Sequence, residues 1–451
     1  MLISFSVENY LSFKNKVLFS MERTSERQKK DRLPYIKKHE INLLPIASIY
    51  GGNASGKSNF VKALRFARNI IVRGAQIDET IPVEPFLLNE DTTNEPSKFV
   101  FVISVNDHIY EYGFKVNKHS VVEEWLIDIL KTTEHDLFSR NHNGMIEFNS
   151  KLSNLTRLKY AAEGTRINQL FLTNTVTQNI KEFENIYYWF RNSLVIMDPN
   201  TKFHAYNEFT AEKAPLRELV NSALQGLDTG IQRLGEESVA IDTIPLPAKL
   251  RDQIEKIPAN TVTNLDLSNG EKYVLYNRNG DEIKAAKIVS FHSGINGIEK
   301  KFDFKKESDG TRRVIDLLPA FIESSQAASE KVFIIDEIDR SLHSLLVKRL
   351  LQTYLNSCDK DSRSQLIFTT HDLMLIDQNL MRRDEMWVME RDNEESSRLY
   401  SISDYKDVRN DKDIRKSYIQ GRFGGVPRIL LEDSFNIDTL WDDDDDGTEK
   451  N

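Results

Sequence analysis

Apolar and polar residues alternate in the first part of the chain, as they do in the strands of an antiparallel sheet. Residues 2–20 place apolar side chains at every second position, and residues 98–130 repeat this pattern with polar turns between the runs. Between these regions, the apolar run 45–50 ends in a glycine-rich turn, and residues 59–72 carry apolar side chains at helical spacing. The pattern predicts an antiparallel meander and a unit of strand, glycine loop and helix.

The C-terminal part alternates between helices and short strands that are apolar throughout. We expect helices over residues 314–322 and 342–355, and strands over residues 331–335, 365–369 and 386–389. A strand without a polar face must be covered on both sides, so this pattern predicts a sheet between two layers of helices.

These patterns divide an α/β protein into four parts. Residues 1–135 form an N-terminal lobe, and residues 286–430 form the C-terminal half of the same domain. Residues 136–285 form a mainly helical insertion, because large apolar side chains recur there at helical spacing, although its polar end could be irregular or a hairpin. Residues 431–451 form an acidic tail, which we expect to be disordered because it cannot bury enough apolar surface to fold alone.

The charge of the chain lies mainly in this tail. The net charge is −9, and the tail holds nine acidic residues and one basic residue, so the rest of the chain is almost neutral. Net charge therefore does not exclude a DNA-binding surface. A docking or self-inhibitory role for the tail is the alternative to a solvated end.

Composition also indicates the cellular compartment in which the protein works. The single cysteine, Cys358, excludes an intramolecular disulfide framework and a cysteine-based zinc site. No apolar run approaches the roughly 18 residues of a membrane span, and the first residues lack the pattern of a signal peptide. We expect a cytoplasmic protein.

Residues 51–58 fit the pattern G-x-x-x-x-G-K-[ST] of a phosphate-binding loop, between a predicted strand and a predicted helix. Its glycines let backbone N–H groups surround an anion, and the helix points its positive end at the same place. The ammonium group of Lys57 would reach the outer phosphates, and the hydroxyl of Ser58 could coordinate Mg²⁺. The residues expected around the phosphates are Gly51, Gly52, Asn53, Ala54, Ser55, Gly56, Lys57, Ser58 and Asn59.

Two adjacent carboxylates, Asp336 and Glu337, follow the apolar strand 331–335. At the end of a buried strand they would lie near the phosphates of the loop. We predict that Asp336 holds Mg²⁺, directly or through water, and that Glu337 polarises the attacking water. The alternative is a strand that ends in a solvated acidic pair.

Two further segments lie at the ends of predicted elements. His371 follows the apolar strand 365–369, where its side chain could contact a γ-phosphate, although a lone histidine is normally structural. Ser308 and Gly310 open the helix that precedes the acidic strand, so a hydroxyl and free N–H groups form a second place for an anion. Alone, this segment would be an ordinary helix cap.

In this order the motifs resemble those of an ABC-type ATPase head. The phosphate loop is followed by a signature motif at 308–313, the acidic strand end, a D-loop at Asp339 and a switch histidine at His371. The loop variant 53–59 and the opening segment 5–13 are similar to the SMC/RecF/OLD branch and not to transporter ATPases.

More narrowly, three segments resemble the AbiL/RloA-type ATPases of bacterial anti-phage, abortive-infection systems. These segments are 308–311, 336–343 and 421–427. The signature reads Ser-Asp-Gly-Thr where transporters have Ser-Gly-Gly-Gln. No glutamine is assigned to the Q-loop.

The resemblance implies a hydrolase that binds ATP and Mg²⁺ and works as a dimer or a larger assembly. In ABC heads each ATP lies between the phosphate loop of one protomer and the signature serine of the other, so Ser308 would complete a partner's site. The family further implies a sensor or regulator in phage defence, which controls a separately encoded effector, a TOPRIM-like nuclease. The resemblance allows direct binding of DNA by this chain, and it implies no membrane partner.

Three other functions use similar motifs. A DNA-repair ATPase of the RecF class would bind DNA as its main activity. An OLD-type nuclease would carry its own metal site, which Glu390, Asp411 and Asp413 imitate, but the chain after His371 is short for such a domain. A transporter ATPase subunit is disfavoured by the asparagine in the phosphate loop and by the large insertion.

Overall fold

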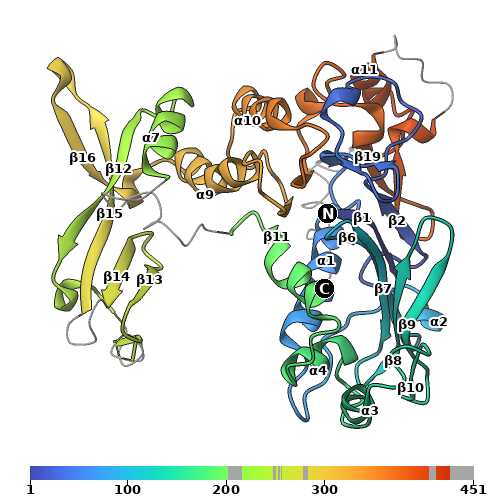
Figure 1. Cartoon of the computed structure of the whole chain (residues 1–451). Coiled ribbons are helices and arrows are strands. Elements are labelled where there is room, and N and C mark those ends of the chain that lie inside the picture. Colours follow the sequence, from blue (N-terminus) through green and yellow to red (C-terminus); the bar gives the residue numbers. More distant parts are fainter. Residues whose placement is uncertain are drawn as a thin grey trace, which may run out of the picture.

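The computed structural model describes residues 1–201, 216–246, 250–251, 254, 256–277, 283–405 and 413–426. The acidic tail predicted at 431–451 and the residue Asp411 lie outside this part. The described residues form three large sheets and the helices that pack against them (Figure 1).

The first sheet is antiparallel, has seven strands and contains the predicted meander. Its strands lie in the order β10-β9-β8-β7-β6-β1-β2. The bounds are β1 (Leu2–Glu8), β2 (Val17–Ser20), β6 (Ser97–Val105), β7 (His108–Val116), β8 (Val121–Ile129), β9 (Glu134–Arg140) and β10 (Ile146–Phe148). The predicted strands are confirmed, and β9 and β10 continue the sheet beyond the boundary predicted at residue 135.

The second sheet has six strands in the order β11-β17-β18-β5-β19-β20. Its first five strands are parallel, and β20 pairs antiparallel with β19. The bounds are β5 (Ile46–Tyr50), β11 (Leu194–Met197), β17 (Val332–Ile335), β18 (Gln365–Thr369), β19 (Met386–Arg391) and β20 (Ser397–Ser401). The four apolar strands predicted from the sequence are β5, β17, β18 and β19.

Three long helices accompany this sheet: α1 (Lys57–Arg73), α9 (Asp309–Ser324) and α10 (Ser344–Ser357). Alternate residues of the strands belong to two different buried clusters. Ile49 and Ile367 pack with α1 and the seven-stranded sheet, whereas Ile335 packs with α9 and α10. The six-stranded sheet is therefore covered on both faces, as its apolar strands predict.

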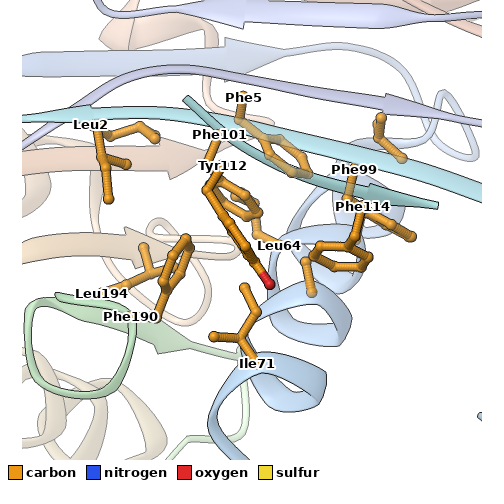
Figure 2. Packing of buried hydrophobic residues seen from close by; sticks show 14 of the residues in the cluster. Leu2, Phe5, Leu64, Ile71, Phe99, Phe101, Tyr112, Phe114, Phe190 and Leu194 are labelled. Carbon is orange, nitrogen blue, oxygen red and sulfur yellow. The ribbon is translucent and has the colours of Figure 1, made fainter. Parts of the chain in front are cut away.

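The larger cluster fills the space between α1 and the seven-stranded sheet. Figure 2 shows Leu64 and Ile71 of α1 facing the rings of Phe101, Tyr112 and Phe114. Phe190, from the helical segment that precedes β11, closes the cluster, and its ring meets that of Phe101 at a centroid distance of 5.0 Å. This packing holds α1, and with it the phosphate loop, against both sheets.

The third sheet forms a separate lobe, which Figure 1 places beside the other two sheets with α9 leading towards it. Its strands are β12 (Ile231–Val239), β13 (Thr261–Asp266), β14 (Lys272–Asn277), β15 (Ile283–Ser293) and β16 (Glu299–Asp303). The helix α7 (Arg217–Gly226) packs on β12. We call this unit the β lobe.

The prediction of a mainly helical insertion over 136–285 is wrong for this lobe. Helices occur at α3 (Thr156–Glu163), α4 (Phe171–Thr177), α5 (Glu184–Tyr188) and α7, but the segment also supplies β11 to the six-stranded sheet and most strands of the β lobe. The boundary at 285 falls inside β15, which pairs with β12, β14 and β16. Strands that depend on partners more than 40 residues away, as β12 depends on β15, leave little local signal.

The shorter elements are β3 (Tyr35–Ile36), β4 (Ile41–Asn42), α2 (Glu90–Thr93) and α11 (Ile414–Ile419). Among the described residues, no helix has the length and apolar character that crossing a membrane requires.

Candidate active site

The phosphate loop connects the end of the buried strand β5 to the first turn of α1. The ammonium group of Lys57 donates hydrogen bonds to the carbonyl oxygens of Gly51 at 2.8 Å and Gly52 at 3.0 Å. Gly56 precedes the helix with a φ of 109°, and a Cβ atom at this position would collide with Ser397 and Ser12. The loop therefore has one tightly packed shape, which requires glycine at position 56.

The loop lines a cavity of about 300 Å³ that also receives side chains from other segments. Besides residues 53–59, the lining contains Ser12, Glu337, His371 and Arg391. Glu337 and His371 were expected here from the sequence, whereas Ser12 and Arg391 had no assigned role. An acid and an imidazole thus share one cavity with the phosphate loop.

Lys57 is buried, and its positive charge favours the binding of an anion in the cavity. Burial lowers the pKa of Lys57 to about 8, while the carboxylates of Asp336, Glu337 and Asp339 act in the opposite direction. With this pKa the side chain is still mostly protonated at pH 7. A cation that has lost most of its water attracts an anion strongly.

Thr369, at the end of β18, organises the acidic pair. Its hydroxyl donates a hydrogen bond to Oδ1 of Asp336 at 2.6 Å and accepts one from the backbone N–H of Glu337 at 2.8 Å. Glu337 has a φ of 49°, a left-handed conformation that costs energy in a residue with a side chain. Glu337 lines the cavity of the phosphate loop, whereas Asp336, one residue earlier, is buried.

His371 and Asp339 lie next to this pair. The backbone N–H of His371 donates a hydrogen bond to Oδ2 of Asp339 at 3.3 Å. Partial burial and the nearby charge of Lys57 lower the pKa of His371, so the neutral imidazole is favoured at pH 7. The ring N–H of a neutral imidazole can donate a hydrogen bond to a phosphate oxygen.

The residues Ser58 and Asp336 fit a magnesium ion. Ser58 lines the cavity, and among the described residues the carboxylate of Asp336 accepts a hydrogen bond only on Oδ1. The described part of the chain contains no group of three or more His, Cys, Asp or Glu residues that could hold a metal ion. Mg²⁺ keeps several waters and needs few protein oxygens, which agrees with this small set.

The signature residues lie on a different part of the surface. Ser308 caps α9 and accepts a hydrogen bond from the N–H of Thr311 at 3.1 Å, and its side chain is exposed. Gly310 lies so close to the carbonyl of Ser341 that a Cβ atom would approach it to 2.6 Å. Neither Ser308 nor Gly310 lines the cavity of the phosphate loop, so the fold of the single chain does not bring the two motifs together.

A buried arginine nevertheless connects the signature helix to the acidic strand. Arg313 donates hydrogen bonds to the carbonyl oxygens of Asp198 at 3.3 Å and Asp336 at 3.4 Å. Burial lowers its pKa, and its Nε has no hydrogen-bond partner in the described part of the chain. The first turn of α9 is therefore fixed to the ends of β11 and β17.

The sequence placed Arg313 in the signature segment without a role of its own, and it assigned no role to Thr369, Ser12, Ser397 or Arg391. Thr369 could have been found, because it ends the same predicted strand that leads to His371. Ser12, Ser397 and Arg391 come from segments far from the phosphate loop in the sequence, and only the fold brings them to it. No glutamine lines the cavity among the described residues, so the Q-loop stays unassigned.

Glu390 and Asp413, which resemble the carboxylates of a two-metal nuclease site in the sequence, do not form such a site among the described residues. Glu390 lies at the end of β19 against Gly424, and Asp413 accepts a hydrogen bond from the N–H of Lys416 as the cap of α11. Asp411 lies outside the described residues.

We predict that Gly56→Ala destabilises the protein by about 2 to 4 kcal/mol, from backbone strain and the collision with Ser397. Gly144→Ala is the control, because Gly144 also has a positive φ, 80°, but open space around it. The control should cost only about 1 kcal/mol. Urea unfolding measures both, and equal losses would contradict a tightly packed phosphate loop.

The sequence and the structure were compared with known proteins. No curated protein matches the chain. Among solved structures, the SMC head domain from Thermotoga maritima matches with a TM-score of 0.35 and 11% identity, over 89% of this chain and 98% of that one. An SmcHead bound to the C-winged helix domain of ScpA matches with a TM-score of 0.39 and 12% identity, over 89% and 97%.

The family assignment depends instead on a sequence match that covers more than half of the chain. Residues 46–152 and 191–377 match the family described as "AAA domain, putative AbiEii toxin, Type IV TA system". The two matched ranges contain the phosphate loop, the signature helix, the acidic pair and His371. The chain belongs to this family of AAA-domain proteins.

Proposed function

We propose that the protein binds and hydrolyses ATP with Mg²⁺ as a head-to-head dimer, and that it regulates an effector in bacterial anti-phage defence. The observation that carries the ATPase proposal is the single cavity that Lys57, Ser58, Glu337 and His371 line together. When bound, Mg²⁺ would neutralise phosphate charge, with Ser58 and Asp336 as its protein ligands.

The residues divide the reaction between them. Lys57 and the N–H groups of the loop would hold the phosphates, and Glu337 would orient the attacking water and take up its proton. His371 would contact the γ-phosphate and so distinguish ATP from ADP. Asp339 would hold the backbone of His371 in place through its hydrogen bond.

A dimer is supported by the position of the signature motif. Ser308 and Gly310 lie outside the cavity of their own protomer, on an exposed helix N-terminus that favours an anion. A second copy, turned to face the first, could bring this N-terminus to the γ-phosphate. Each ATP would then lie between two chains.

The defence role is supported by the printed description of the family, which names a putative AbiEii toxin and a type IV toxin–antitoxin system. We propose that ATP binding and hydrolysis control a separately encoded effector, a TOPRIM-like nuclease. The nucleotide state of the two ATPase heads would change when the phage trigger is sensed. The effector nuclease would then be activated and cleave nucleic acid.

We predict that Glu337→Gln binds ATP but hydrolyses it at least a hundredfold more slowly, because the base that activates water is lost. ATP should then convert this variant to a dimer, which light scattering measures as a doubled mass. Lys57→Ala, which lacks the phosphate-binding cation, should stay monomeric. A Glu337→Gln chain whose mass ignores ATP would contradict the sandwich dimer.

We predict that ATP binding weakens as the pH rises above about 8. The pKa of Lys57 is about 8 without nucleotide, and the phosphates of ATP bind the protonated side chain better. Above pH 8 the side chain must therefore take up a proton when ATP binds, which costs free energy. The Kd should be constant near pH 7 and rise about tenfold per pH unit above pH 8. Titration calorimetry measures this, and Lys57→Arg, which stays charged, should abolish the dependence. A flat profile in the unaltered chain would contradict the role of Lys57.

For the defence role we predict that cells with the gene and its natural neighbours resist phage, and that Lys57→Ala or Glu337→Gln removes this resistance. Plaque counts measure the effect, with the expression of each variant checked in parallel. Equal protection by the variants would contradict an ATP-dependent regulator. A growth defect after DNA damage without phage would support a repair ATPase instead.

A further inference from the structure

The hairpin formed by β19 and β20 lies against the phosphate loop. The hydroxyl of Ser397, in β20, donates a hydrogen bond to the carbonyl oxygen of Ser55 at 2.7 Å and lies 2.8 Å from the hydroxyl of Ser12. The backbone N–H of Ser397 donates to the carbonyl of Ser12 at 2.7 Å. These bonds fix the hairpin to the loop.

Arg391, the last residue of β19, lies directly opposite Ser397 in the antiparallel pair. Side chains of directly opposite residues project from the same face of a sheet. Because Ser397 faces the phosphate loop, Arg391 faces it too, and it lines the cavity together with Lys57 and Ser58. The hairpin thus places Arg391 beside the phosphate site.

The present partner of Arg391 is a carboxylate on the same hairpin. Its Nη1 lies 2.7 Å from Oε2 of Glu395, and the two side chains are 40% and 58% exposed. Ion pairs this exposed are weak, because water and salt screen them. A phosphate can displace such a carboxylate, since a terminal phosphate carries up to two negative charges and its oxygens accept paired hydrogen bonds from a guanidinium.

The strand order decides which side of the phosphates Arg391 can reach. β5, which leads into the loop, lies between β18 and β19. Glu337 and His371 are positioned at the β18 side, and Arg391 ends β19 on the opposite side. Arg391 therefore lies away from the attacking water.

We propose that Arg391 is a nucleotide-binding residue, which leaves Glu395 and donates hydrogen bonds to a phosphate of the nucleotide held by the loop. Glu395 is the competing carboxylate that holds the guanidinium until a nucleotide binds. The assignment rests on the ATPase proposed above. It makes Arg391 a determinant of nucleotide affinity.

The test measures the Kd of ATP and of inorganic tripolyphosphate for single variants of the full chain. Arg391→Ala should raise both Kd values by about ten- to hundredfold, because a charge-assisted hydrogen bond is lost. Arg391→Lys should recover part of the affinity. Glu395→Gln should lower the Kd by a few fold, since the competing charge is gone.

The same hairpin offers a matched control pair. The ammonium group of Lys14 lies 2.8 Å from Oε2 of Glu394, but Lys14 does not line the cavity. Lys14→Ala and Glu394→Gln should leave both Kd values unchanged. Thermal unfolding of all variants checks that the hairpin stays folded.

Three results would overturn the assignment. The first is an unchanged Kd in Arg391→Ala while the unaltered chain binds ATP. The second is an equal loss of affinity in Arg391→Ala and Lys14→Ala, which would point to the hairpin as a whole. The third is a loss for ATP but not for tripolyphosphate, which would place the contact at the ribose or base. An unaltered chain that binds no ATP would overturn this assignment and the proposed ATPase together.

Discussion

The hydroxyl of Thr369 joins the groups on which the site depends. It donates to the carboxylate of Asp336 and accepts from the backbone of Glu337, so the ends of β17 and β18 are tied by two short hydrogen bonds. These bonds can form only because β17 and β18 run parallel and in register, with Ile335 opposite Phe368. Parallel strands deliver their carboxyl ends to one edge of a sheet, and β5 delivers the phosphate loop to the same edge.

This edge is stable because the strands behind it are buried on both faces. Ile49 and Ile367 pack towards α1, and Ile335 packs towards α9 and α10. The close packing of such a core leaves little freedom for the strand ends, so the strained backbone of Glu337 can be held in place. The buried strands thereby hold the residues at their carboxyl ends in defined positions.

The signature helix extends these contacts towards the β lobe. Arg313 fixes the first turn of α9 to the carbonyl of Asp336, and Asp316, one turn later, lies 4.0 Å from Lys272 of the β lobe. Gly270, in the turn before β14, lies close to the side chain of Arg312. A continuous series of contacts therefore runs from the acidic pair through α9 to the lobe, although neither end is adjacent to the other in the sequence.

The sequence by itself determined the α/β class, the meander, the apolar strands and the residues that carry the proposed chemistry, because periodicity and short motifs are local properties. It did not determine the β lobe, whose first strand, β12, pairs with β15 more than 40 residues away, or the β11 strand, which pairs with β17 more than 100 residues further along the chain. Only the tertiary structure brought Ser12, Ser397 and Arg391 to the phosphate loop, since their positions follow from strand pairing. It also separated Ser308 from the cavity of its own protomer, which no spacing along the chain could reveal.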